Sequence, residues 1–439
     1  PNIDRLASEG VRFSNFFCTT ALCSPSRASY LTGTYAHTHG VTQNDPRVDP
    51  DWESCPPFTV ELQGAGYETA MVGKIHMKHA EGKEHIRPGF NYWLSFQGQG
   101  EYFDPVLNEN GREFREKGYM TDILTRYAID WLRNKRDSSK PFSLFLWHKA
   151  VHEPFTPPER YVGIYRNELL PEPPYGTAGE TFLGKPEWQR IKAYDSKWKD
   201  YRPVPELPKK EWNPHNKMYI SLLECLLAVD ESTGNVLKTL EEIGELDNTV
   251  VIYASDNGYF MGEHTYWDKR IAYEPSMRIP LIMRFPQDIR AGSEIEELCL
   301  NIDVAPTILD LAGIEIPDYM QGESFLRLLS GGPQAGWRNS FLFEYYVDDA
   351  YPYAGPDLLA VRTDSFKLVD AFLDNDIDEL YNLSNDPGEM INLISDTSMR
   401  DTEQSLRREL EKLRVIYKYN PDRDWWLRKV VNDSLDNGR

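Results

Sequence analysis

The sequence predicts an α/β fold, in which helices sandwich a large mixed, mostly parallel sheet and a smaller C-terminal α+β subdomain is built on an antiparallel sheet. Up to about residue 335, short apolar runs rich in β-branched and aromatic residues alternate with helical patterns, as in α/β proteins. Beyond that point, several strand-like runs precede one charged helix. With 439 residues, the chain is long enough for one large unit with a smaller one attached.

The predicted elements follow in chain order. Apolar runs predict strands at 11–17, 68–73, 142–147 and 249–254. A helix is predicted at 121–132, and its sheet-facing side consists of Ile123, Leu124, Tyr127, Ala128, Trp131 and Leu132. A longer helix is predicted at 218–244, with a bend at Gly234 and its end at Gly244. After residue 335, the runs FLFEYYV, LLAVRT, FKLVDA and ELYNL predict a small antiparallel sheet, and TEQSLRRELEKLRVIY predicts a helix.

From about 165 to 215 the pattern becomes irregular, with prolines interleaved among tryptophan and tyrosine. A loop region of this length is usually functional or disordered. Its aromatic rings could line a sugar-binding cleft or pack into the core, and the sequence leaves both open. The rings concerned are Trp188, Tyr194, Trp198, Tyr201 and Trp212.

The composition excludes several classes of protein. Hydrophobic residues make up 40% and aromatic residues 13% of the chain, which is too much for a disordered protein. The net charge of −21 argues against nucleic-acid or anionic membrane partners, because these need an extended basic face. A few local cations can still hold one small anion. The longest apolar stretch, at 221–229, is too short to cross a bilayer, so no membrane span is expected.

The cysteines say little about the cellular compartment. Cys18, Cys23, Cys55, Cys225 and Cys299 are too few and too scattered for a disulfide framework, and no CxxC pair suggests zinc. The chain begins without an initiator Met, so a signal peptide would lie upstream of it. We expect a periplasmic or secreted location rather than a cytoplasmic one.

Reactive side chains follow the carboxyl ends of the four predicted strands. They are Cys23 after the first strand, Lys74 and His76 after the second, His152 after the third, and Asp256 and Asn257 after the fourth. In open α/β sheets, ligands bind at this edge. We therefore expect these separate segments to form one pocket.

The segment CSPSRASYLTG at 23–33 predicts a short helix, with Ser24 as its N-cap, Pro25 as its first residue and Gly33 as its end. Cys23 would then lie at a helix N-terminus, where free amides and the helix dipole favour an anion, and Arg27 could add a charge. A small buried cysteine before a capped helix is the alternative. The Cys–Arg spacing is too short for the loop of a cysteine-dependent phosphatase.

The segment CSPSR followed by LTG resembles the CxPSR signature of type I sulfatases. Other segments extend the resemblance along nearly the whole chain: PNIDRLASEGVRFSNFF at 1–17, GKIH at 73–76, AVHEPF at 150–155, SDNGYFMGEHTYWDKR at 255–270 and ELYNLSNDPGE at 379–389. The resemblance implies an alkaline phosphatase-like fold, with a sulfatase catalytic domain at 1–335 and the α+β subdomain at 336–439. It also implies a first strand, carrying two adjacent metal-binding aspartates, upstream of residue 1.

The resemblance also implies the chemistry. In this family a formylglycine-generating enzyme oxidises the cysteine to formylglycine, and a hydroxyl of the hydrated aldehyde attacks sulfur. The implied catalytic residues are Cys23, Arg27, Lys74, His76, His152 and Lys269. Among them, His152 resembles the acid, with Lys269 nearby, and His76 resembles the base. Lys74 resembles the residue that binds formylglycine or sulfate oxygens. Predicted substrate contacts are His148, Lys149 and His264.

Asp256 and Asn257 carry hard oxygen donors in a loop after a strand, which suits Ca²⁺ or Mg²⁺ rather than zinc. The same DNG triplet is a strong turn signal, so the pattern alone leaves a structural role open. The resemblance implies that both residues bind the metal, with Ca²⁺ as the usual ion and Mg²⁺ as the alternative.

QGQGEYFDPVLNENG at 97–111 and the following GYMTDILTRYAIDWL resemble a subgroup that includes N-acetylglucosamine-6-sulfatases and other glycan sulfatases. The implied function is hydrolysis of a sulfate ester on a sulfated sugar or glycan, although aryl and choline esters stay open. One alternative is a phosphonate monoester or phosphodiester hydrolase of the same superfamily. The other is a noncatalytic glycan-binding homologue on the same fold.

Overall fold

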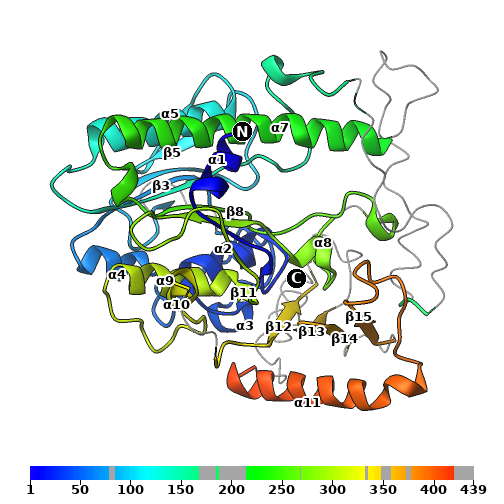
Figure 1. Ribbon diagram of the computed structural model, residues 1–439. Helices are drawn as coiled ribbons and strands as arrows, with labels where there is room; N and C mark the ends of the chain where they lie inside the picture. The colour runs from blue at the N-terminus through cyan, green and yellow to red at the C-terminus, as the bar shows by residue number, and fades with distance from the viewer. Residues whose placement is uncertain are drawn as a thin grey trace, which may run out of the picture.

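The computed structural model describes residues 1–78, 85–166, 168, 184–186, 214–266, 268–331, 335–347, 357–371 and 377–419 (Figure 1). Most of the irregular region predicted at 165–215, including its five aromatic rings discussed above, lies outside the described residues. Its two alternatives, a cleft lining or core packing, therefore stay predictions.

The larger sheet is organised around strand β3 (Glu68–Lys74). β3 pairs in parallel with β4 (Tyr92–Phe96) on one side and with β7 (Phe142–Trp147) on the other. The antiparallel strands β5 (Val106–Glu109) and β6 (Arg112–Arg115) extend the sheet beyond β4, giving the order β6-β5-β4-β3-β7. Only β3 and β7 of these five strands were predicted.

A second mixed sheet has the order β10-β1-β9-β8. Its strands are β10 (Ser293–Ile295), β1 (Val11–Phe13), β9 (Leu281–Arg284) and β8 (Val251–Ala254). The predicted strand at 11–17 divides after β1, and its second part, β2 (Phe16–Phe17), pairs with β11 (Cys299–Leu300). The fold is thus the predicted α/β fold with mixed sheets. The described strands nevertheless form separate sheets rather than one large sheet, and β7 and β8 are each the edge strand of their sheet.

Helices cover both faces of the larger sheet because side chains along β3 point alternately to opposite sides. Ala70 and Val72 pack against α5 (Met120–Asp130) and α7 (Pro214–Glu242), which lie side by side over one face (Figure 1). Met71 packs with Ala28 and Leu31 of α2 (Cys23–Thr32) on the other face. The apolar face predicted at 121–132 is confirmed, since its residues lie in the first of these clusters.

The long helix α7 runs without interruption through Gly234, so the predicted bend is not observed. A Cβ atom at Gly234 would lie 2.5 Å from the side chain of Asn2 in α1 (Asn2–Glu9), so the glycine lets α1 pack closely on α7. After the helix, Gly244 adopts a left-handed conformation with φ of 76°. Among the residues described, no helix is both long enough and apolar enough to cross a membrane.

The remaining helices are short and lie mostly around the lower face of the sheets in Figure 1. The α-helices are α3 (Ala36–His39), α4 (Thr59–Gly64), α8 (Glu274–Met277), α9 (Val304–Leu311) and α10 (Leu326–Leu329). A π-helical turn, η2 (Trp131–Lys135), continues α5. Single 3₁₀ turns are η3 (Glu159–Tyr161), η5 (Leu246–Asn248), η6 (Glu263–Thr265), η7 (Asn301–Asp303) and η8 (Thr397–Met399).

The C-terminal part is an antiparallel sheet in the order β12-β13-β14-β15, covered on one side by helix α11 (Figure 1). These elements are β12 (Ser340–Tyr345), β13 (Leu358–Thr363), β14 (Phe366–Asp370), β15 (Glu379–Asn382) and α11 (Arg400–Ile416). The predicted small α+β unit is therefore present. Its hydrophobic core is continuous with that of the preceding part. The ring centroids of Phe341 and of Phe17 in β2, for example, are 4.9 Å apart. The boundary at 335/336 stays a prediction.

His37 of α3 connects the two parts of the chain through both of its ring nitrogens. Nδ1 lies 2.8 Å from a carboxylate oxygen of Glu344 in β12, and Nε2 lies 2.9 Å from the carbonyl oxygen of Tyr417. Because both partners accept hydrogen bonds, the ring donates from both nitrogens when it is protonated. Burial opposes this charge, but Glu344 outweighs burial and raises the pKa of His37 above its ordinary 6.5.

We predict that this contact stabilises the fold at low pH and is lost as pH rises. A raised folded-state pKa gives stability that is fully present below the ordinary value of 6.5 and disappears as pH rises through the folded value. The His37→Ala substitution should cost about 1.5–3 kcal/mol in the acidic range, as for hydrogen bonds to charged groups, and less in alkaline solution. Chemical denaturation across this range measures the difference.

His39→Ala is the matched control on the same helix. Burial lowers the pKa of His39 to about 3, so above pH 6.5 its ring is neutral in both the folded and the unfolded chain. The effect of His39→Ala on the free energy of unfolding should therefore stay constant over the pH range in which the effect of His37→Ala declines. Parallel curves for both variants would contradict the assignment.

Candidate active site

Helix α2 begins at Cys23, two residues before Pro25, which the sequence predicted as its first residue. The helix begins here because the Ser26 amide already donates to the carbonyl of Leu22, at 2.9 Å. Ser24 is not the N-cap, since its hydroxyl and amide both contact Oδ1 of Asn44, at 2.9 and 3.0 Å. The predicted end is confirmed: Gly33 has φ of 67° and its amide donates to Ser29.

The Cys23 side chain is buried among cations and imidazoles, with only 2% of the residue exposed. Burial by itself raises the pKa of a thiol. The charges of Lys269 and Lys74, together with hydrogen bonds to His152 and His76, outweigh burial and lower the pKa of Cys23 well below its ordinary 9.0. Four residues from three separate segments therefore surround the side chain at position 23 and favour negative charge there.

Lys74 ends β3, and the residue before it fixes its position. A Cβ atom at Gly73 would lie 1.9 Å from the carbonyl oxygen of Trp147, so only glycine allows the ends of β3 and β7 to approach this closely. The Lys74 ammonium donates to Oε1 of Gln99 at 2.6 Å. Burial lowers the pKa of Lys74 to about 8, so its charge is easily lost when no anion is near.

His152 and His76 are both neutral in this environment. Burial and the charge of Lys269 lower the pKa of His152 to about 4, and burial likewise lowers that of His76. Nδ1 of His152 lies 2.6 Å from the carbonyl oxygen of Glu153, which can only accept, so Nδ1 carries the proton. Nε2 is then the ring atom left for the contact with Cys23, or with a ligand in the same place.

Lys269 behaves differently from the histidines. Although burial opposes its charge, Cys23 and Asp268 outweigh burial and raise the pKa of Lys269 above 10.5. Its ammonium lies 5.9 Å from the ring centroid of Tyr259. Lys269 is therefore a permanent cation beside Cys23, whereas His152 can gain or lose a proton.

Arg27 joins the loops that follow three strands. Its Nε and Nη2 donate to Oδ2 of Asp256 at 2.9 and 2.8 Å, and Nη1 donates to the Lys74 carbonyl at 2.9 Å. The guanidinium also lies 4.9 Å from the ring centroid of Trp147. These contacts and those of Cys23 bring Cys23, Lys74, His152 and Asp256 together, as expected for the segments after the four strands, and a shared pocket stays a prediction.

Asn257 offers an oxygen to which none of the described residues donates a hydrogen bond. Its Oδ1 atom is buried and has no hydrogen-bond partner among the described residues, while its Nδ2 donates to the Gly258 carbonyl at 2.7 Å. A buried amide oxygen left unpaired is costly unless a cation or water meets it. With Asp256 next to it, the donor type fits Ca²⁺ or Mg²⁺. The described residues contain no group of three or more His, Cys, Asp or Glu that could hold a metal, so these two donors are an incomplete shell.

The three predicted substrate contacts lie in different places. Lys149 is 4% exposed, and its pKa is lowered to about 8 by burial and then by the charge of Lys74, which places it beside the pocket. His148 instead points toward the helices, because its Nε2 lies 3.0 Å from the hydroxyl of Ser232 in α7. His264 packs against the ring of Tyr273, with centroids 4.8 Å apart. Lys149 is thus the one of the three whose contacts place it beside Cys23 and Lys74, and the role of all three as substrate contacts stays a prediction.

Sequence reasoning missed several residues that touch the pocket. Asn44 binds Ser24, Gln99 binds Lys74, Trp147 stacks on Arg27, and Tyr102 binds the backbone of His152. Gln99 and Tyr102 follow β4, a strand that was not predicted. The glycines at 98 and 100, both with positive φ, were the available signal for a tight loop after a strand.

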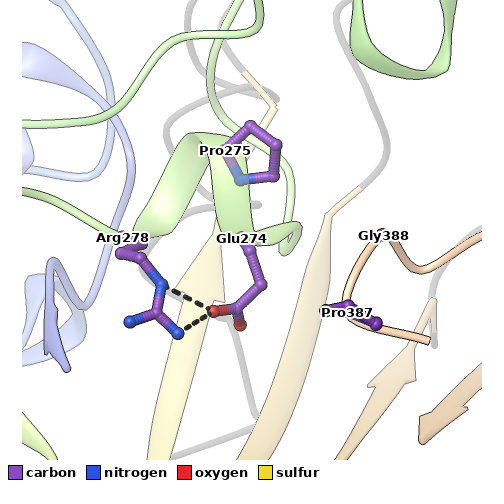
Figure 2. Close-up of a pocket in the computed structure, with 5 residues that line it drawn as sticks. All are labelled: Glu274, Pro275, Arg278, Pro387 and Gly388. Atoms are coloured by element: carbon purple, nitrogen blue, oxygen red, sulfur yellow. Dashed lines mark hydrogen bonds and ion pairs between the residues drawn. The ribbon is translucent and has the colours of Figure 1, made fainter. Parts of the chain in front are cut away.

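A separate cavity of about 210 Å³ lies where α8 meets the C-terminal part (Figure 2). Its lining consists of Glu274, Pro275, Arg278, Pro387 and Gly388. Arg278 donates to Oε2 of Glu274 at 2.6 and 3.0 Å, and Glu274 also pairs with the buried Lys367 at 3.0 Å. These charges are paired with one another, and none of the predicted site residues lines the cavity, so it is not the candidate active site.

We predict that the unconverted protein carries one thiolate at neutral pH. The pKa of Cys23 is lowered, whereas burial raises the pKa of each of the other cysteines, that of Cys225 to about 11. Acidification of the Cys form should therefore remove one equivalent of ultraviolet thiolate absorbance. The Cys23→Ser variant should lack this signal and Cys225→Ser should retain it; a signal that persists without Cys23 would contradict the assignment.

Two family models match the chain. The model described as Sulfatase matches residues 1–314, and the model described as N-sulphoglucosamine sulphohydrolase, C-terminal, matches residues 262–416. An N-acetylglucosamine-6-O-sulfatase of Bacteroides thetaiotaomicron is 36% identical over 476 residues, covering 96% of this chain and 83% of that protein. The N-acetylglucosamine-6-sulfatase of Homo sapiens is 31% identical over 355 residues, covering 76% of this chain and 61% of that protein.

Solved structures agree with these matches. A structure described as a complex with its substrate D-glucosamine-2-N,6-O-disulfate has a TM-score of 0.82 and 34% identity, covering 96% of this chain and 93% of that chain. The phosphonate monoester hydrolase of Agrobacterium radiobacter has a TM-score of 0.74 at 23% identity, covering 95% and 91% of the two chains, which shows a shared fold alone. The matches span both the strand ends around Cys23 and the C-terminal sheet, and this chain belongs to the sulfatase family.

Proposed function

We propose that this sulfuric ester hydrolase removes the 6-O-sulfate from a glucosamine unit of a sulfated glycan, with formylglycine derived from Cys23 as its nucleophile. The observation that carries the proposal is the surroundings of Cys23: a buried helix N-terminus, two lysines and two histidines that together favour negative charge. A group that attacks an anionic ester needs such surroundings, because they stabilise the charge that develops in the transition state.

The sugar and the ester position are supported by the relatives. The bacterial and human proteins described above are named for the 6-sulfate of N-acetylglucosamine, and the solved complex holds a glucosamine sulfated at N2 and O6. These names describe those proteins. The segment at 97–111, which resembles the same subgroup, supplies Gln99 beside Lys74 and Tyr102 beside His152, so the similarity reaches the pocket itself.

The charge and protonation of these residues indicate the role of each in the reaction. Lys269 and Lys74 are the cations that bind the sulfate oxygens. His152 is the acid that protonates the leaving sugar oxygen, because its ring contacts position 23 while its Nδ1 is held by the Glu153 carbonyl. His76, whose Nδ1 lies 3.3 Å from the Ser24 hydroxyl and whose ring contacts Cys23, is the base that restores the resting state. Formylglycine supplies, as its hydrate, the hydroxyl that attacks sulfur.

Asp256 and Asn257 are the residues that would hold Ca²⁺, with Mg²⁺ as the alternative ion. The unpaired Asn257 oxygen fits a hard cation, and Arg27 leaves Oδ1 of Asp256 facing only the amide of Asn257. Calcium takes about six to eight oxygen ligands, so further ligands must come from other segments, substrate or water. The cation would stabilise charge on the sulfate oxygens.

Maturation and location follow from the same proposal. The substrate partner is a glycan sulfate ester, and the partner during synthesis is a formylglycine-generating enzyme that acts on Cys23. A periplasmic or secreted location suits a glycan substrate, and an extracellular sulfatase homologue of Drosophila melanogaster is among the relatives, at 31% identity over 77% of this chain.

We predict that co-expression with a formylglycine-generating enzyme converts Cys23 and gives sulfate release from N-acetylglucosamine 6-sulfate. Peptide mass spectrometry of the segment around Cys23 detects the exchange of thiol for aldehyde, and ion chromatography measures sulfate. Cys23→Ala is the control, and it should abolish release. Faster turnover of the matched 6-phosphate would favour the phosphohydrolase alternative, and saturable glycan binding with no turnover would favour a noncatalytic binding protein.

We also predict that Asn257→Ala weakens calcium binding by roughly 10-fold or more, because even changes outside the ligand shell reach this range. Isothermal titration calorimetry with calcium alone measures the affinity without reference to turnover. Asn385→Ala, at an exposed position, is the control and should leave the affinity unchanged. Equal affinities for Asn257→Ala and the parent chain would remove Asn257 from the metal site.

A further inference from the structure

Tyr102 lies in the loop between β4 and β5 and is 5% exposed. Its ring stacks on that of Tyr119, with centroids 5.9 Å apart and planes at 17°. The hydroxyl reaches across to the loop that follows β7, which carries His152. A buried tyrosine hydroxyl usually has a hydrogen-bond partner, and here two partners are backbone atoms of a single residue, with the Cys225 thiol as a further contact.

The Tyr102 hydroxyl binds both backbone polar groups of His152. It donates to the His152 carbonyl oxygen at 2.6 Å and accepts from the His152 amide at 3.1 Å. One hydroxyl has one proton to donate and lone pairs to accept, so both bonds form at the same time. Because the imidazole branches from the backbone between these two groups, the two bonds fix the point from which it extends toward Cys23.

The same loop contacts other groups of the pocket. Gln99 accepts from the Lys74 ammonium at 2.6 Å, three residues before Tyr102. The Lys149 ammonium also lies over the ring of Tyr102, 4.6 Å from the ring centroid. The loop is therefore anchored to β3 and to the segment after β7 at once, which gives it a defined position relative to both.

We propose that Tyr102 is the positioning residue of the acid His152, and that its hydroxyl sets how well the imidazole reaches the leaving-group oxygen of the sulfate ester. This proposal rests on the proposed function, in which His152 protonates that oxygen. Tyr102 does not touch the substrate in this role. It acts through the backbone of His152 alone.

The test uses the dependence of the reaction on the leaving group. A sugar alcohol leaves poorly and needs a proton, whereas nitrophenol leaves well without one. In Tyr102→Phe, which keeps the ring and removes the hydroxyl, kcat for N-acetylglucosamine 6-sulfate should fall roughly 10- to 100-fold, the range expected for misplacement of a reacting group. With 4-nitrophenyl sulfate, kcat should fall less than about threefold, since the acid contributes little there.

Two comparisons make the result specific. Tyr119→Phe removes a hydroxyl from the ring stacked on Tyr102. Any change in kcat that it causes should be the same for both esters. His152→Ala should show the same split between the two esters as Tyr102→Phe but a larger one, of about 10²- to 10⁴-fold, as for loss of a general acid. An unfolded fraction lowers both rates by the same factor, so partial loss of folding cannot produce the split.

The outcomes separate the two proposals. Equal losses for both esters in Tyr102→Phe, with a split in His152→Ala, would overturn the positioning role and leave the proposed function intact. Absence of a split in His152→Ala would overturn the acid role of His152, and the role of Tyr102 with it. A parent enzyme with formylglycine at position 23 and no turnover of either ester would overturn the proposed function itself.

Discussion

The pocket depends on the buried guanidinium of Arg27. Strands β3 and β8 belong to different sheets, and the described residues contain no strand pairing that joins them. Arg27 instead bonds the Asp256 carboxylate after β8 and the Lys74 carbonyl at the end of β3, and stacks on Trp147 at the end of β7. Arginine suits this position because its planar guanidinium bonds several acceptors at fixed angles while its face contacts an aromatic ring. Loss of one partner of such a buried pair typically costs roughly 3–5 kcal/mol.

The strands that the sequence predicted correctly are apolar runs, and the helix α5 that it predicted has one apolar face. β3 is a buried apolar run inside the larger sheet, and β7 is a half-buried apolar run at its edge. The apolar face of α5 follows a period of 3.6 residues. Some of the elements that were missed are polar or very short, although the buried strands β4 and β9 were missed as well. β6, with the sequence REFR, is mostly exposed, and β11 has two residues. A strand held mainly by pairing with its neighbour leaves little hydrophobic signal in its own sequence.

The site shows the same division. Reactive residues at strand ends were found because the position of a strand end can be inferred locally, and one topological rule brings such ends together. Gln99, Asn44 and Tyr102 were missed because their roles arise from contacts between loops far apart in the chain. Ser24 was assigned the wrong role for the same reason. Its local sequence fits an N-cap, but a partner at position 44 competes for its hydroxyl.

The proposed conversion of Cys23 to formylglycine would change the charge balance around this residue. In the Cys form, the thiolate raises the pKa of Lys269 and opposes the lowering of that of Lys74. A neutral aldehyde or hydrate in place of the thiolate leaves these buried ammonium groups without that anion. Buried cations without a counter-charge are strongly destabilised, so a ligand that brings a negative charge to this point relieves the cost. The sulfate group of a substrate brings such a charge, and the resting pocket is therefore already organised for an anionic ester in a protein whose net charge of −21 would otherwise repel it.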